Sequence, residues 1–158
     1  MLNAILKKLQ YKLQPEILLV DAPHEFVSVV SDWKKTAAIQ TDAVQGKHFN
    51  FAVVFVKTIK DVSAASRKYV KLLEPDAVFW MVYPKKTSKK YKSDITRDNG
   101  WQALGEMGYE GVSMISIDDD WSAFRFRKPD FIKTLKRRES MTLTEAGKSR
   151  AKASKIKK

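Results

Sequence analysis

Two uninterrupted apolar runs constrain the fold of this chain more than any other feature. Residues 51–56 read FAVVFV, and residues 77–83 read AVFWMVY. A strand with one solvent-exposed face alternates apolar and polar residues, whereas an uninterrupted apolar run indicates a strand that is covered on both faces. A segment of helical pattern, TIKDVSAASRKYVKLL, separates the two runs. Because such a long crossover returns the chain in the same direction, we expect parallel neighbouring strands.

The first 130 residues continue this alternation of strands and helices. The pattern predicts helices near residues 2–13, 23–33, 58–73 and 96–107, the third with Thr58 and Asp61 at capping-box spacing. It predicts strands near residues 16–21, 36–43, 51–56, 77–84, 111–117 and 121–127. The last two strands are too close for a crossover, so they form a hairpin. The predicted fold class is α/β, a mostly parallel sheet of about six strands with helices on both faces and an antiparallel C-terminal hairpin.

The positive charge is concentrated in two segments. Residues 85–97 contain six Lys and Arg against one acid, residues 132–158 contain ten against two, and the remainder is almost neutral within a net charge of +12. Clustering of this kind on a neutral body points to an anionic partner. We expect one domain over residues 1–130, followed by a flexible or weakly helical basic tail over residues 131–158.

The composition excludes several kinds of chemistry. The chain has no cysteine, which rules out disulfides and thiolate catalysis. Its two histidines, His24 and His48, have no acidic partners at metal-binding spacing, so we expect no metal site. The apolar runs reach about seven residues, far fewer than a membrane span requires, and the N-terminus lacks a signal-peptide pattern. We therefore expect a cytoplasmic protein that does not enter a membrane.

The order of the elements resembles that of Rossmann-like methyltransferases, whose parallel sheet ends in an antiparallel hairpin. The resemblance implies an S-adenosylmethionine site at the loop after the first strand, where glycines let the backbone approach the ligand. Here that loop reads VDAPHEFVSV without a glycine, and we expect His24, Glu25 and Phe26 to fill the space. Asp42 lies where a ribose-binding carboxylate would be found. We expect no cofactor, and a degenerate methyltransferase is an alternative.

The basic loop follows the end of a predicted central strand, which is where open α/β sheets bind ligands. It leads into the helix predicted at residues 96–107, and free N–H groups at a helix N-terminus attract anions. We expect a phosphate or carboxylate site made by Lys85, Lys86, Thr87, Ser88, Lys89, Thr96, Arg97 and Trp101. The alternative is that the lysines only keep an exposed loop soluble.

Three aromatic or charged side chains near this loop have structural alternatives. Trp101 and Trp121 are each consistent with a core position, since tryptophan on a helix or strand is usually buried. Arg125 on the last predicted strand needs a partner if it is buried. Asp94, Asp98 or Asp118 is the expected partner, which would make the cluster a structural network rather than a site.

Four stretches resemble a family of small bacterial proteins classified as a domain of unknown function. They are VDAP (20–23), YPKKTSK (83–89), SDITRDNGW (93–101) and EGVSMISIDDDWSAFRF (110–126). The resemblance covers about residues 5–128 and implies a Rossmann-like α/β domain with no assigned activity. The shared residues are Pro84, Lys85, Thr87, Ser88, Lys89, Asp94, Thr96, Arg97, Asp98, Gly100, Trp101, Asp118, Trp121, Ser122 and Arg125.

The charge pattern predicts a non-catalytic module that binds a phosphate-containing ligand or RNA. The loop and the tail together carry +13, enough to hold phosphates through counterion release. The tail residues expected to contact nucleic acid are Lys136, Arg137, Arg138, Lys148 and Arg150. The alternative is that the tail only keeps the protein soluble. The alternatives are a small-molecule enzyme or sensor with a pocket at residues 83–101, or a scaffold that binds protein.

Overall fold

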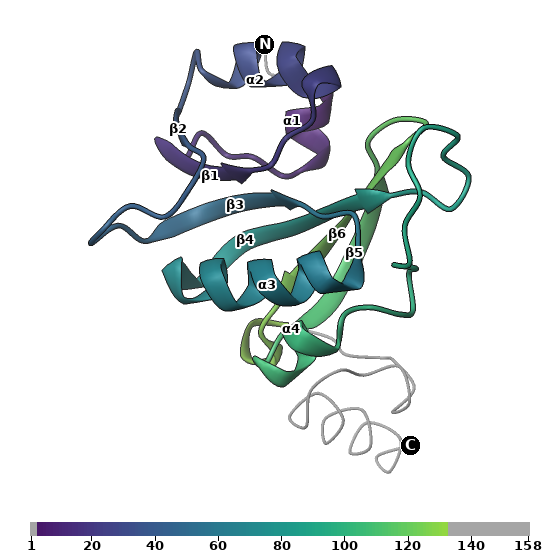
Figure 1. Ribbon diagram of the computed structural model, residues 1–158. Helices are drawn as coiled ribbons and strands as arrows, with labels where there is room; N and C mark the ends of the chain where they lie inside the picture. Colours follow the sequence, from purple (N-terminus) through teal and green to yellow (C-terminus); the bar gives the residue numbers. More distant parts are fainter. Residues whose placement is uncertain (1–2, 133–158) are drawn as a thin grey trace, which may run out of the picture.

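The computed structural model describes residues 3–132, which form a six-stranded sheet with helices on both faces (Figure 1). The strands are β1 (Glu16–Val20), β2 (Ala38–Gln40), β3 (Phe49–Phe55), β4 (Leu73–Pro84), β5 (Glu110–Ser116) and β6 (Trp121–Arg127). The α-helices are α1 (Ala4–Lys8), α2 (Val27–Trp33), α3 (Ile59–Tyr69) and α4 (Gln102–Glu106). Single 3₁₀ turns are η1 (His24–Phe26), η2 (Val70–Leu72) and η3 (Pro129–Phe131).

The strand order is β2-β1-β3-β4-β6-β5, and the predicted α/β class is confirmed. Strands β2, β1, β3 and β4 are parallel, while β6 pairs antiparallel with both β4 and β5. The chain leaves β1 toward β2 on one side and then returns to build β3 on the other. The C-terminal ends of β1 and β3 therefore form a topological switch point, where sheets of this kind leave a crevice.

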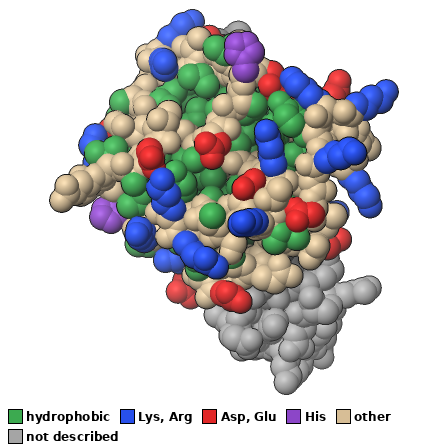
Figure 2. Space-filling model, viewed as in Figure 1, with side chains coloured by type: hydrophobic (Ala, Val, Ile, Leu, Met, Phe, Trp, Pro, Cys, Tyr) green, Lys and Arg blue, Asp and Glu red, His purple; other side chains and the backbone are tan. Residues whose placement is uncertain are grey.

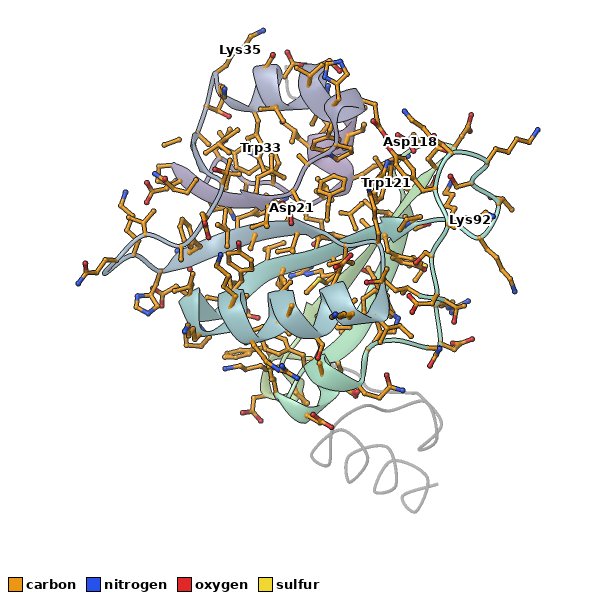
Figure 3. The ribbon with its side chains drawn as sticks, in the orientation of Figure 1. Asp21, Trp33, Lys35, Lys92, Asp118 and Trp121 are labelled. Carbon is orange, nitrogen blue, oxygen red and sulfur yellow. The ribbon has the colours of Figure 1, made fainter. Side chains whose placement is uncertain are left out.

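Two hydrophobic layers cover the two faces of the sheet. Along β3, Phe51 and Val53 pack in the layer of α1 and α2, whereas Ala52 and Val54 pack in the layer of α3 and α4. Trp33 contributes to the first layer from α2, on the side of the sheet where Figure 3 labels it. Burial on both faces is the physical reason why the run at residues 51–56 shows no alternation.

The first helix and the second strand are shorter than the sequence predicts. Helix α1 ends at Lys8 because Gln10 and Leu13 have positive φ angles of 61° and 65°, which a right-handed helix cannot contain. The indole Nε1 of Trp80 donates to the carbonyl of Leu9 at 2.8 Å and holds this turn on the sheet. Strand β2 has three residues, so Asp42 lies beyond its end.

The helix predicted over residues 96–107 is wrong in its first half. Thr96 and Asn99 exchange backbone hydrogen bonds of 3.0 and 3.4 Å, which close a tight turn. Gly100 follows with φ +111°, so α4 begins only at Gln102. The turn preference of the Asp-Asn-Gly sequence outweighs the apolar spacing here. Thr96 and Arg97 therefore do not lie at a helix N-terminus.

Candidate functional site

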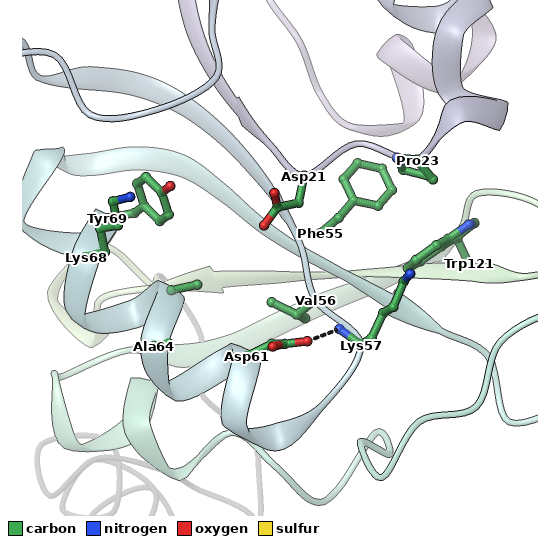
Figure 4. Close-up of a pocket in the computed structure, with 11 residues that line it drawn as sticks. Asp21, Pro23, Phe55, Val56, Lys57, Asp61, Ala64, Lys68, Tyr69 and Trp121 are labelled. Atoms are coloured by element: carbon green, nitrogen blue, oxygen red, sulfur yellow. Dashed lines mark hydrogen bonds between the residues drawn. The ribbon is translucent and has the colours of Figure 1, made fainter.

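A pocket of about 500 Å³ opens at the C-terminal ends of β1 and β3, at the switch point of the sheet (Figure 4). Its walls come from four parts of the chain. Asp21 follows β1, Lys57 follows β3, Tyr69 lies on α3 and Trp121 begins β6. This volume lies within the range of about 300–1,000 Å³ that is usual for small-molecule sites.

The turn after β1 leaves this space open. Asp21 has a φ of +57°, a left-handed conformation that aspartate adopts more readily than most residues. The following side chains point elsewhere: Glu25 bonds to Tyr91 and Trp121, and Phe26 is buried against Phe55 with 5.1 Å between ring centroids. The expectation that the bulk of Glu25 and Phe26 fills the space is therefore wrong.

Asp61 is one of two charged pocket residues that already serve the fold. Its carboxylate accepts hydrogen bonds from the backbone N–H groups of Lys57 and Thr58 at 3.1 and 3.2 Å. The hydroxyl of Thr58 in turn accepts from the backbone N–H of Asp61 at 3.0 Å. This reciprocal pair is the predicted capping box, and it stabilises the first turn of α3.

Lys68 is the second charged pocket residue with a fixed partner. Its ammonium lies 3.0 Å from the carboxylate of Asp42, and the Tyr69 hydroxyl donates to the same oxygen at 3.1 Å. The hydrogen bond from Lys68 lowers the pKa of Asp42, while burial raises the pKa of the Tyr69 hydroxyl. Asp42 is thus tied to α3.

Asp21 and Lys57 are the remaining charged groups of the pocket. Within residues 3–132, neither side chain forms an ion pair with a group of opposite charge. The Lys57 ammonium lies 4.9 Å from the centroid of the Tyr91 ring. Figure 4 shows Lys57 rising toward Trp121, while Asp21 enters the pocket from the turn after β1. An unpaired carboxylate and an unpaired ammonium thus face one cavity.

Residues 85–92, here called the lysine loop, are anchored at their base to the β5–β6 turn. The backbone N–H of Lys85 donates to the carbonyl of Asp120 at 2.7 Å, and the Ser88 hydroxyl donates to the Asp120 carboxylate at 2.8 Å. The Lys85 ammonium donates to the Ser116 hydroxyl. Lys86, Thr87 and Lys89 are exposed. Figure 3 shows Lys92 at the outer end of this part of the molecule, where basic side chains gather in Figure 2.

Tyr91 connects the lysine loop to the rim of the pocket. Its hydroxyl donates to Glu25 at 2.6 Å, and its ring lies 4.8 Å from the ring of Trp121. The Trp121 Nε1 donates to the same Glu25 oxygen at 3.1 Å, and the Lys90 ammonium lies 3.4 Å from the other oxygen. The Tyr91 hydrogen bond is the main reason that the pKa of Glu25 is lowered to about 2.

Substitution of Glu25 by glutamine is expected to lower the free energy of unfolding at pH 7 by about 1–2 kcal/mol, a value reduced because the carboxylate is partly exposed. A lowered folded-state pKa means that the carboxylate stabilises the fold above its unfolded pKa near 4.5, and that this contribution is lost as the pH falls toward 2. Urea unfolding of both proteins between pH 7 and 3 should therefore show a difference that shrinks with acidification. Glu74→Gln, on an exposed position, is the control. A constant difference would contradict the prediction.

Trp101 belongs to the core and not to a ligand site. Its side chain is only 2% exposed, and its ring lies 5.3 Å from the rings of both Tyr83 and Phe124. Its Nε1 donates to the carbonyls of Thr96 and Arg97 at 2.9 and 3.2 Å. The sequence-based assignment of Trp101 to the anion site is corrected, because the indole faces the α3 and α4 layer.

The other predicted site residues lie on two different segments of the chain. Thr96 and Arg97 are exposed on the turn before α4, while the lysine loop is attached to the β5–β6 turn. Whether Lys85, Lys86, Thr87, Ser88 or Lys89 contacts an anion stays a prediction. The tail residues predicted to contact nucleic acid lie outside the described residues: Lys136, Arg137, Arg138, Lys148 and Arg150.

Arg125 finds a partner other than the three predicted acids. Its Nη1 donates to the side chain of Gln10, and burial lowers the pKa of its guanidinium. Asp94 instead accepts from the backbone N–H of Ile59 at 2.8 Å and caps α3. Asp118 accepts from two backbone N–H groups of its own turn. The predicted hairpin turn is confirmed, and the predicted pairing of Arg125 is wrong.

The residues of this site do not fit S-adenosylmethionine, the cofactor implied by the methyltransferase-like order of elements. The turn after β1 offers no glycine, and Pro23 has no N–H to donate. Asp42 does not line the pocket and is held by Lys68 and Tyr69. Among residues 3–132, no group of three or more histidines and acids could hold a metal ion. No helix in this range is long and apolar enough to span a bilayer.

Comparisons with known proteins give no family for this chain. No family model matches it, and no curated protein matches it. It is similar to the solved structure of the N-methyltransferase NodS from Bradyrhizobium japonicum, with 15% identity, coverage of 73% of this chain and 86% of that chain, and a TM-score of 0.48. It is also similar to a protein of the NADB-Rossmann superfamily from Streptococcus agalactiae, with 9% identity, coverage of 99% of this chain and 84% of that chain, and a TM-score of 0.49. Because these TM-scores are below 0.5, neither structure indicates a function for this chain.

Proposed function

We propose that this protein is a non-catalytic module that binds a small phosphate-containing ligand in the pocket at the ends of β1 and β3. One observation carries the proposal: a pocket of about 500 Å³ at the switch point has on its rim the ammonium of Lys57, which pairs with no acid of residues 3–132. The lysine loop reaches the same rim through Tyr91, so further positive charge lies beside it. Lysine binds phosphate as a point charge through strong, charge-assisted hydrogen bonds.

Binding without turnover is proposed because two of the four charged groups of the pocket have structural duties. Asp61 caps α3 and Lys68 is paired with Asp42, so neither is free to transfer a proton without disturbing the helix. The apolar part of the wall, which includes Phe55, Val56 and Ala64, suits a sugar or a flat ring. The site is thus suited to hold a ligand by its ends.

Thermal unfolding of the full chain with a panel of ligands tests this function. A phosphorylated ligand at about 100 times its Kd is expected to raise the Tm by about 5–10 °C, because it stabilises the folded state by about 2.7 kcal/mol. The panel contains ribose 5-phosphate and AMP, with ribose and adenosine as matched compounds without phosphate. A larger shift with the phosphorylated member of each pair is the expected result. A shift with S-adenosylmethionine alone would contradict the proposal.

RNA binding is the second candidate function, favoured by the exposure of Lys86, Lys89 and Lys92. These side chains form no ion pair with an acid of residues 3–132 and are open to a polymer. In the same experiment, a Tm that rises only with an RNA oligonucleotide, and less at higher salt, would favour this surface over the pocket.

A further inference from the structure

The pocket has two charges of opposite sign, at the ends of two different strands, that form no ion pair within the described residues 3–132. Asp21 comes from the end of β1 and Lys57 from the end of β3, whereas Asp61 and Lys68 are held in a cap and an ion pair. We infer that the ligand is a phosphorylated polyol, held with its phosphate at Lys57 and a pair of hydroxyl groups at Asp21. The inference rests on the proposed function and assigns the two ends of the ligand.

The Lys57 end of the pocket is the place for an anion. The Tyr91 ring lies within 4.9 Å of the Lys57 ammonium and 5.5 Å of the Lys90 ammonium, so the two cations share one aromatic side chain. Glu25 pairs with Lys90 at 3.4 Å and balances one of the two charges. Lys57 is an exposed residue, and no acid of residues 3–132 pairs with its ammonium, so one positive charge remains beside the Tyr91 ring. A phosphate can replace the water around this ammonium with charge-assisted hydrogen bonds.

The Asp21 end of the pocket requires a hydrogen-bond donor. An ionised carboxylate only accepts, through two oxygens, and adjacent hydroxyl groups of a sugar can donate to both. The left-handed backbone at Asp21 turns the chain away from the pocket, which leaves the carboxylate at its edge (Figure 4). A second anion at this end would meet a like charge. The two ends of the pocket therefore bind different groups: Asp21 binds the hydroxyl groups of the ligand and Lys57 binds its phosphate.

Calorimetric titration of the full chain tests the two ends separately. The ligands are AMP, adenosine, ribose 5-phosphate and the 2′,3′-dideoxy form of AMP. Lys57→Gln is expected to weaken the affinity for AMP by about tenfold or more, while the affinity for adenosine changes by less than about twofold. Asp21→Asn is expected to abolish the preference, about tenfold in the unchanged protein, for AMP over its dideoxy form. Asparagine tolerates the positive φ of this position, so the fold is retained.

The control variant is Lys60→Gln, on an exposed position of α3 outside the pocket, which removes the same charge and should change no affinity. Circular dichroism and the Tm without ligand check that each variant is folded. Equal affinities for AMP and ribose 5-phosphate would identify a sugar phosphate as the class of ligand, and tighter binding of AMP would identify a nucleotide. If both compounds bind but neither Lys57→Gln nor Asp21→Asn alters selectivity, the inference is overturned while the proposed function stands. If no phosphorylated compound binds, both fail.

Discussion

Replacement of Trp101 by alanine is expected to lower the free energy of unfolding by about 3–5 kcal/mol. The side chain is 2% exposed and contacts the rings of Tyr83, Phe124 and Phe126, with 5.1 Å between the centroids of Trp101 and Phe126. Its removal leaves a cavity between α4 and the sheet that these rings can fill only in part. It also leaves the carbonyls of Thr96 and Arg97 without their indole donor.

Urea unfolding monitored by circular dichroism measures this loss. Trp101→Phe is the matched variant: it keeps a ring in place but removes the Nε1 donor, so a smaller loss of about 1–3 kcal/mol is expected. The result also tests the role of the residue. If Trp101→Ala kept its stability within about 0.5 kcal/mol and lost ligand binding instead, the original assignment of Trp101 to the anion site would be right.

Replacement of Gly111 by alanine is expected to destabilise the fold by about 1–3 kcal/mol through overpacking. A Cβ atom at Gly111 would lie closer than 3.0 Å to Cζ and Cε1 of Phe124. That ring cannot easily move away, because Phe126 lies 4.7 Å from it and Trp101 packs across it. The φ of Gly111 is ordinary for a strand, so the cost is steric and not conformational.

A double-mutant cycle isolates the steric origin of this cost. Combining Gly111→Ala with Phe124→Leu should destabilise less than the sum of the two single changes, because the smaller side chain makes room for the new methyl group. Ser113→Ala, on the same strand, is the control and should cost less than either change. Additive effects would show that the contact between Gly111 and Phe124 does not cause the loss.

The positions of the pocket residues are partly predictable from the sequence. Asp21 and Lys57 each follow directly on a buried strand, and the ends of such strands meet at the crevice of an open sheet. The density of lysines in residues 85–92 instead favours that loop as the predicted anion site. Tyr91 and Glu25 show no pattern in the sequence, because their partnership joins segments 66 residues apart.

The layered arrangement of this protein follows from its amino-acid sequence alone. The uninterrupted apolar runs at residues 51–56 and 77–83 predict burial on both faces of the sheet, and the short spacing of the last two strands requires a hairpin. The capping box at Thr58 is likewise local, since both partners lie within one helical turn. Each of these features depends on periodicity or short-range geometry.

Which charged side chains have partners depends instead on the three-dimensional packing. Lys57 and Lys68 are alike in the sequence, yet Asp42 neutralises Lys68 while Lys57 is left facing the pocket. Trp101 and Trp121 are both buried in the core, at 2% and 1% exposure, yet Trp121 lies in the layer of α1 and α2 and also lines the pocket, whereas Trp101 lies in the layer of α3 and α4. The physical reason is that pairing and desolvation depend on neighbours that are distant in the sequence, and packing alone brings those neighbours together.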